Sequence, residues 1–265
     1  MRLPVICLAV LLFATACGVN KKVSSSANKN EITVMSYNIH HANPPSKPGV
    51  IDLDAIAAVI NKYKPDVVAL QEVDVNTKRS GVNEASLLAE KTKMNFYFAR
   101  AIDYDGGQYG VAILSRQPLN GGTTYPLPTA VGTNGEPRVL STGWIEVNGK
   151  KIVLACTHLD AQRNDTNRVL QINALTGILA KETSPVIIAG DLNATAGGPV
   201  IDVLDQHFTR TCTQNCGFTI PVEVPTKTID FIAFKPGNGF SVVSHTVIDE
   251  KYASDHLPVI ATLKW

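Results

Sequence analysis

The most constraining stretch of this chain is Val186–Asn193, which reads Val-Ile-Ile-Ala-Gly-Asp-Leu-Asn. A continuous apolar run that is rich in β-branched residues predicts a strand buried on both faces. Because side chains alternate along a strand, Asp191 and Asn193 are expected to project to the same side at its carboxyl end. Open α/β sheets bind their ligands at such ends. One carboxylate and one amide aimed at a cleft suit a hard metal ion or a phosphate. A plain strand-ending turn is the alternative, since Gly, Asp and Asn are all turn residues.

The first thirty residues predict export. Arg2 precedes an apolar run, Val5–Ala14, that is too short to cross a bilayer and has the length of a signal-peptide core. Small residues then lead directly to Cys17, as in the processing site of bacterial lipoproteins, where the cysteine becomes the lipid-bearing first residue. An ordinary secretory signal cut nearby is the alternative. The expected organisation is a lipoprotein-type signal peptide over 1–16, a flexible tether over 17–30 that begins with the lipidated Cys17, and one domain over 31–265.

Export makes disulfide bonds possible. Cys212 and Cys216 are spaced to close a small loop, with two free surface thiols as the alternative. Cys156 lies inside an apolar strand pattern and is expected to be a small buried hydrophobe. The formal net charge of +1 argues against a chain that holds long nucleic acid by electrostatics alone, because such a chain needs a basic face.

Strand and helix patterns alternate along the rest of the chain. Ile32–Ile39 predicts a first strand, Asp52–Lys64 has the apolar spacing of a helix that buries one face, and Asp66–Glu72 predicts a second strand. This order indicates a β-α-β unit. Asn148-Gly149 predicts a two-residue hairpin turn. Further strands are expected over 95–102, 109–115, 119–125, 138–147, 152–158, 229–234, 240–248 and 258–263, and further helices over 83–93, 167–181 and 200–206.

Polar side chains stand at or next to the ends of these strands. Each could serve in an ordinary way as a turn former, a cap or a solvated strand end. Together they supply carboxylates, amides and two histidines, which a Mg²⁺-dependent phosphoester hydrolase requires. Oxygen ligands hold the hard cation, and a histidine backed by a carboxylate can take a proton from water. A Ca²⁺ site would need the same inventory. The residues are Asn38, Glu72, His158, Asp191, Asn193, Asp230, Asp255 and His256.

Seven short motifs contain these residues or lie between them, and their order is specific. They are Ser36-Tyr-Asn38-Ile, Leu70-Gln-Glu72-Val, Tyr109–Ser115, Thr157-His158-Leu, Gly190-Asp191-Leu-Asn193, Ile229-Asp230-Phe-Ile and Ser254-Asp255-His256. In this order they resemble the endonuclease/exonuclease/phosphatase superfamily, which includes deoxyribonuclease I. The resemblance covers residues 31–265. It implies an α/β fold, a four-layer α-β-β-α sandwich of two packed mixed β-sheets flanked by helices, with the site at one rim.

The resemblance also implies a metal site. Glu72 would be the principal Mg²⁺ ligand, with Asn38 beside it and Asp255 completing the metal sphere. Mn²⁺ and Ca²⁺ are the alternative ions. Arg79 and Arg138 are weaker candidates for contacts with substrate phosphate, which a fork-shaped guanidinium suits, and exposed surface charge is the alternative for both.

The resemblance further implies roles in catalysis. His256, oriented by Asp230, would activate the attacking water or pair with the scissile phosphate. Asp191 would position or deprotonate that water. Asn193 would hold a phosphate oxygen, and His158 would donate a hydrogen bond to the phosphate or protonate the leaving oxygen.

The expected function is an exported hydrolase of phosphoester bonds, a phosphodiesterase or a phosphatase, in which water attacks phosphorus directly. The substrate would be small or lipid-derived. The protein would be a monomer, held to the membrane by its lipid anchor and facing the periplasm or the cell exterior. One alternative is a secreted or periplasmic nuclease that degrades DNA or RNA. Another is a catalytically idle lipoprotein that uses the same cleft for binding.

Overall fold

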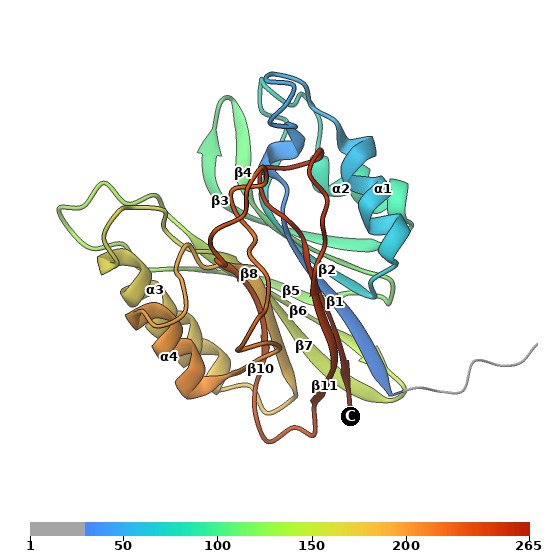
Figure 1. Cartoon of the computed structure of the whole chain (residues 1–265), viewed down its shortest axis with the longest axis vertical. Coiled ribbons are helices and arrows are strands. Elements are labelled where there is room, and N and C mark those ends of the chain that lie inside the picture. Colours follow the sequence, from blue (N-terminus) through green and yellow to red (C-terminus); the bar gives the residue numbers. More distant parts are fainter. Residues whose placement is uncertain (1–29) are drawn as a thin grey trace, which may run out of the picture.

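Two six-stranded β-sheets form the centre of the computed structural model, which describes residues 30–265 (Figure 1). In both sheets one neighbouring pair is parallel, β1 with β2 and β7 with β8, and the other pairs are antiparallel. The first sheet has the order β11-β12-β1-β2-β4-β3, with bounds Ser241–Val247, Val259–Lys264, Glu31–Asn38, Val67–Val75, Gly107–Ser115 and Asn95–Tyr104. The second has the order β5-β6-β7-β8-β10-β9, with bounds Asn120–Pro126, Val139–Val147, Lys150–His158, Val186–Asp191, Asp230–Phe234 and Thr209–Arg210.

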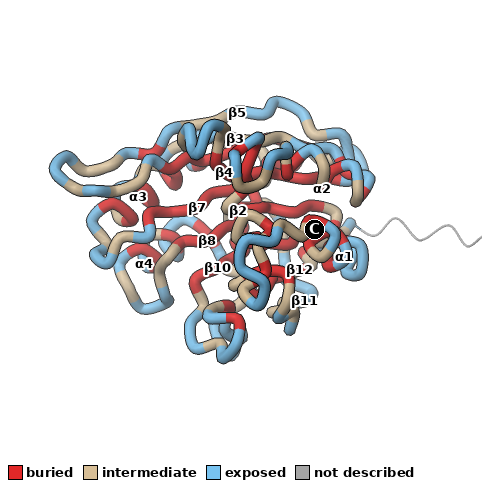
Figure 2. The backbone as a smooth tube through the Cα atoms, turned by 90° about the horizontal axis from the view of Figure 1, so that it is seen from above, coloured by how far each residue is buried: buried red, intermediate tan, exposed pale blue. Residues whose placement is uncertain are grey.

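Helices cover the outer faces of both sheets, as Figure 1 shows. α1 (Leu53–Tyr63) and α2 (Glu84–Thr92) pack on the first sheet, and α3 (Thr166–Ala180) and α4 (Pro199–His207) pack on the second. A 3₁₀ turn, η1 (His40–Ala42), follows β1. Three buried apolar clusters result, one between the sheets and one under each helix pair. In Figure 2 the buried residues concentrate in the central strands. The predicted four-layer α-β-β-α sandwich is therefore confirmed.

The packing of β8 explains why its apolar run is continuous. Ile187 belongs to the cluster between the sheets, whereas Val186 and Ile188 belong to the cluster under α3 and α4. Alternating side chains thus meet a hydrophobic layer on both faces, and every residue of the strand is buried. The predicted strand over Val186–Asn193 ends two residues earlier, at Asp191.

The predicted β-α-β unit is present as β1, α1 and a parallel β2. The side chain of Asp52 accepts a hydrogen bond from Ala55 N at 3.0 Å and caps α1. The hairpin turn at Asn148-Gly149 has φ values of 51° and 76°, as a type I′ turn requires. The remaining predicted elements are present with shifted ends. The structure also contains the short strand β9 after α4, where no strand was predicted.

Cys212 and Cys216 are joined by a disulfide bond, and Cys156 is a buried free thiol. Within residues 30–265 we find no helix that is long and apolar enough to cross a bilayer. The predicted signal peptide, the lipidation site at Cys17 and nearly all of the tether lie outside the described residues.

Gly190 lies where β8 passes against β7, paired in register with Thr157. A Cβ at Gly190 would overlap the Thr157 carbonyl oxygen, which belongs to the backbone and has little freedom to move. We expect Gly190→Ala to lower the free energy of unfolding by about 1–3 kcal/mol, as overpacking does elsewhere. Gly177→Ala in α3 is the matched control, because a Cβ there meets no atom within 4 Å. Alanine is preferred to glycine inside helices by about 0.5–1 kcal/mol, so this control should be stabilising. Urea denaturation would measure both, and changes of the same sign would contradict the prediction.

Candidate active site

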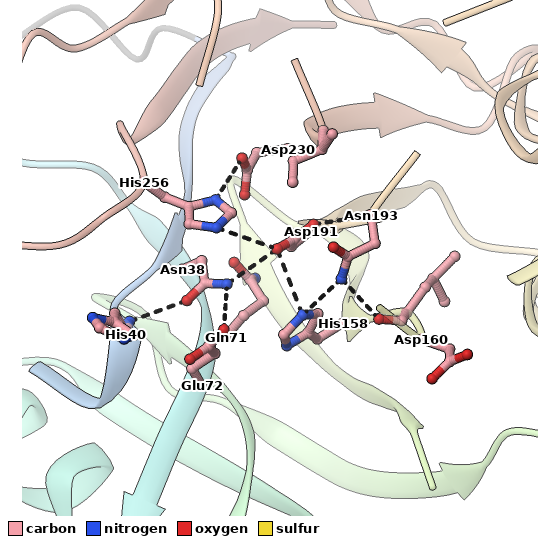
Figure 3. A network of polar contacts seen from close by, with 12 residues as sticks. Asn38, His40, Gln71, Glu72, His158, Asp160, Asp191, Asn193, Asp230 and His256 are labelled. Carbon is pink, nitrogen blue, oxygen red and sulfur yellow. Dashed lines mark hydrogen bonds and ion pairs between the residues drawn. The ribbon is translucent and has the colours of Figure 1, made fainter. Parts of the chain in front are cut away.

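The predicted site residues come together at one rim of the sandwich, between the two sheets (Figure 3). The parallel pairs β1–β2 and β7–β8 both point their carboxyl ends toward this rim. Asn38 ends β1, and Glu72 lies within β2. His158 ends β7 and Asp191 ends β8, where the two are register partners. The second sheet and the loop before β12 supply the rest of the group: Asn193, Asp230, Asp255 and His256.

Asn193 faces the site for a different reason from the one predicted. It follows the end of β8 and has a left-handed φ of 48°, so strand alternation does not apply to it. Its backbone N–H donates to Asp191 Oδ1 at 2.8 Å, which is the geometry of a turn closed by an aspartate side chain. This segment is therefore both a strand-ending turn and part of the site.

A buried acid–base cluster occupies the floor of the site. His256 Nδ1 donates to Asp230 Oδ2 at 2.9 Å, and His256 Nε2 lies 3.7 Å from Asp191 Oδ2. Burial alone would lower the pKa of His256, but the charge and hydrogen bond of Asp230, with Asp191 and Asp255 nearby, raise it to about 10. Burial, and then the charge of Asp230, raise the pKa of Asp191 to about 7. The cluster thus pairs an imidazolium with a carboxyl group that changes its protonation near neutral pH.

His158 is the second histidine beside Asp191. Its Nε2 lies 3.5 Å from Asp191 Oδ2 and 3.0 Å from Asn193 Nδ2, and its Nδ1 lies 3.3 Å from Arg138 Nη1. Burial, and then the charge of Arg138, hold the pKa of His158 well below its ordinary value. At neutral pH this imidazole is therefore uncharged, in contrast to His256.

Glu72 reaches the site through an irregularity in β2. The pairing of β2 with β4 shifts register between Leu70 and Val73, and Glu72 has a left-handed φ of 58°. Such bulges redirect a side chain and are common beside active sites. Glu72 Oε1 accepts a hydrogen bond from Asn38 Nδ2 at 3.1 Å. Burial alone would raise the pKa of Glu72, but His41, His158 and Asn38 together hold it well below its ordinary value, so the carboxylate is ionised.

Asn38 lies between the two sheets and orients both carboxylates. Its Nδ2 also donates to Asp191 Oδ2 at 3.0 Å, and its Oδ1 accepts from His40 N at 3.1 Å (Figure 3). In this orientation the amide nitrogen, rather than the oxygen, faces the carboxylates. Its role as a metal ligand stays a prediction.

Glu72 and Asp255 both line a cavity of about 360 Å³, which we call the cavity above Glu72. Two of the predicted metal ligands therefore face the same space. Among residues 30–265, three metal-binding side chains lie close together in two places: Asp191, Asp230 and His256 in the buried cluster, and His40, His41 and Glu72 in this cavity. The structure also places here Tyr109 and Glu136, to which the sequence analysis assigned no role in the site. The cavity is lined by His40, His41, Glu72, Arg79, Tyr104, Tyr109, Glu136 and Asp255.

The two candidate arginines are both beside the site and already carry partners. Arg79 donates from Nε and Nη2 to both oxygens of the buried Asp74, at 2.6 and 2.9 Å, and lies over the ring of Tyr104. Arg138 is buried, and its Nη2 lies 3.1 Å from Glu136 Oε2. Neither is a freely exposed surface charge. Contact of either with phosphate stays a prediction.

A second cavity, of about 490 Å³, is lined in part by Asn193. Its lining includes the basic side chains of Arg163, Arg168 and Lys227. Candidate site residues thus line two polar cavities, Asn193 this one and Glu72 and Asp255 the other.

Comparisons with known proteins bear on the family and the fold of this chain. A model of the family described as "Endonuclease/Exonuclease/phosphatase family" matches residues 35–256. The uncharacterized protein YbhP of Escherichia coli K12 is 26% identical over 247 residues, covering 87% of this chain and 95% of YbhP. An endonuclease/exonuclease/phosphatase of Beutenbergia cavernae has a similar structure, with a TM-score of 0.76, 27% identity and coverage of 89% of this chain and 72% of that one. A mannosyl-6-phosphatase of Bacteroides thetaiotaomicron shares the fold, with a TM-score of 0.70, 18% identity and coverage of 88% and 100%.

Proposed function

We propose that this chain, which belongs to the endonuclease/exonuclease/phosphatase family, is an exported, divalent-metal-dependent hydrolase of small or lipid-derived phosphoesters. Family members are hydrolases that act on phosphoesters, and a phosphatase is among the proteins that share this fold. The observation that carries the proposal is the buried carboxylate of Asp191, whose Oδ2 lies 3.7 Å from His256 Nε2 and 3.5 Å from His158 Nε2. A carboxylate so placed can take a proton from water beside an anion held by imidazoles.

The protonation states assign the roles in this proposal. Because the pKa of His256 is raised to about 10, this side chain is an imidazolium at neutral pH and suits the phosphate rather than the water. Asp191, with a pKa of about 7, is then the general base, since a base works best when its pKa is near the working pH. The uncharged His158 and the amide of Asn193 donate hydrogen bonds to phosphoryl oxygens. Asp230 fixes the orientation of His256 through its 2.9 Å hydrogen bond.

The carboxylates of the neighbouring cavity fit a divalent cation. Glu72 is ionised and Asp255 lines the same space, which makes them a pair of hard oxygen donors. In the proposal they hold Mg²⁺, or Mn²⁺ or Ca²⁺, together with Asn38. The bound cation supplies positive charge against the phosphoryl oxygens as negative charge grows on them.

The cavities support a compact substrate. The cavities of about 360 and 490 Å³, lined in part by Glu72 and by Asn193, are of the size that holds small molecules. The formal charge of +1 gives little support to a protein that grips long nucleic acid. The proposal also includes export as a monomeric lipoprotein anchored through Cys17 and facing the periplasm or the cell exterior. The disulfide between Cys212 and Cys216 supports an oxidising location.

The test is hydrolysis by the purified protein with and without Mg²⁺. The substrates are bis-(p-nitrophenyl) phosphate, plasmid DNA and a sphingomyelin dispersion, with His256→Ala as the inactive control. We expect Mg²⁺-dependent release of p-nitrophenolate that falls at least about 100-fold in the variant, the lower end for loss of a proton-handling group. Preferred cleavage of plasmid DNA that weakens steeply with salt would favour the nuclease instead. No metal-dependent hydrolysis of any substrate would favour the idle binding protein.

A further inference from the structure

We infer that His40, His41 and Glu72 form a binding site for a borderline transition-metal ion of the Zn²⁺ type, with two imidazole nitrogens and one carboxylate as ligands. The inference rests on the proposed function in one respect, because it uses Glu72 as a metal ligand. It goes further in naming two histidine ligands and the class of ion that they select. One ligand atom from each of the three side chains lies within 4.8 Å of the others.

The backbone turns sharply to present the two histidines. His40, His41 and Ala42 have left-handed φ values of 47°, 42° and 53° in succession. Residues other than glycine adopt this region rarely, and runs of it cluster at functional sites. The turn begins two residues after Asn38, whose Oδ1 accepts a hydrogen bond from His40 N at 3.1 Å. As a result both rings line the cavity that contains Glu72, with their centroids 4.4 Å apart.

His41 is the second, independent sign of a ligand. Its Nδ1 is buried and has no hydrogen-bond partner among the described residues. The nearest carboxylate oxygen, Glu72 Oε2, lies 3.8 Å away, which is too long for a hydrogen bond. Ligand atoms bound tetrahedrally at about 2.0–2.1 Å are separated by about 3.3 Å, so a small closure would let both atoms bind one ion.

His40 is held as metal-binding histidines usually are. Its Nδ1 lies 2.9 Å from the carbonyl oxygen of Asn43, which can only accept a hydrogen bond. This contact places the proton on Nδ1 and leaves Nε2 with a free lone pair, the arrangement in which a backbone carbonyl orients a metal-bound imidazole. Two imidazoles with one carboxylate favour Zn²⁺ or Co²⁺ over Mg²⁺, which prefers oxygen ligands.

The test measures metal binding by the metal-depleted protein. Calorimetry and the visible absorption of bound Co²⁺ are the two readouts. Asparagine is the replacement at both histidines because it tolerates the left-handed backbone and so preserves the turn. We expect one Co²⁺ to bind more tightly than Mg²⁺, and His40→Asn and His41→Asn each to weaken Co²⁺ binding by about 100-fold. His207→Asn is the matched control, because His207 is exposed on α4 and is expected to leave binding unchanged.

Two results would overturn the inference. One is wild-type protein that binds Co²⁺ no more tightly than Mg²⁺, which needs no variant to fold. The other is Co²⁺ affinity that changes less than about two-fold in both folded asparagine variants, against the loss expected of ligands. Hydrolysis of bis-(p-nitrophenyl) phosphate by the same wild-type preparation separates the two proposals. Tight, histidine-dependent Co²⁺ binding without hydrolysis would end the proposed function alone, whereas hydrolysis without that binding would end this inference alone.

Discussion

Asp191→Asn is expected to lower kcat for phosphoester hydrolysis by about 1,000-fold, the middle of the range for a general base. The variant keeps the shape of the side chain, but its single oxygen can accept only one of the two hydrogen bonds that Asp191 receives, from Asn38 Nδ2 and from Asn193 N. It cannot accept a proton from water. In the wild type, burial and the charge of Asp230 raise the pKa of Asp191 to about 7, so activity should fall as pH drops below that value. This acid limb should be missing from the residual activity of Asp191→Asn, and a pH–rate profile of each protein would measure it.

Stability separates this catalytic role from a structural one. The pKa of Asp191 is higher in the folded state than in the unfolded state, so the folded protein binds a proton at Asp191 more tightly. The folded state therefore loses stability as pH rises from about 4 to about 7 and this proton is released. Asparagine carries no such charge, so the denaturant concentration that unfolds the variant should lack this fall between about pH 4 and about pH 7. Asp202→Asn, an exposed change on α4, is the control and should leave turnover unchanged. A less stable Asp191→Asn protein with an unaltered acid limb would assign Asp191 to the fold alone.

The fold follows closely from the sequence because its layers leave regular patterns. β8 is apolar at every position up to Gly190 because both of its faces are covered, and few other environments in a folded protein select such a run. The polar residues that end the strands were predictable for the same reason. Where Asn38, His158 and Asp191 interrupt apolar segments, the strand leaves the core at the rim of the sandwich.

The lining of the cavity above Glu72 could not be predicted in the same way. β2 continues through Val73 and Val75 with an ordinary strand pattern, so no residue in it signals the bulge that turns Glu72 toward the site. Tyr109 and Glu136 reach the cavity from other parts of the chain, and their approach depends on how the sheets pack. The histidine pair His40-His41 follows Asn38 closely and so flanks the predicted site, but a solvated loop is the simpler explanation of its sequence.

Asp230→Asn is expected to lower kcat by roughly 100- to 10,000-fold, the range seen when a histidine at an active site loses its carboxylate partner. The charge and hydrogen bond of Asp230 are the main causes that raise the pKa of His256 to about 10 against the effect of burial. Without that charge the pKa of His256 must fall, so the imidazolium loses its proton at lower pH and the alkaline limb of the pH–rate profile moves to lower pH. The charge of Asp230 also raises the pKa of Asp191, and the acid limb should therefore move in the same direction.

A shift of both limbs of the pH–rate profile toward lower pH is the result that only this electrostatic coupling predicts. NMR titration of the His256 ring would measure its pKa directly in the wild type and in Asp230→Asn, and circular dichroism would verify that the variant is folded. If Asp230 acts only by holding the ring in place, kcat should fall by the same factor at every pH while both limbs and the His256 titration stay where they are. Because His256 Nε2 lies 3.7 Å from Asp191 Oδ2, the proton on His256 also sets how readily Asp191 gives up its own. Under the proposed mechanism Asp230 therefore controls the charge of both groups, the cation that faces the phosphate and the base that faces the water.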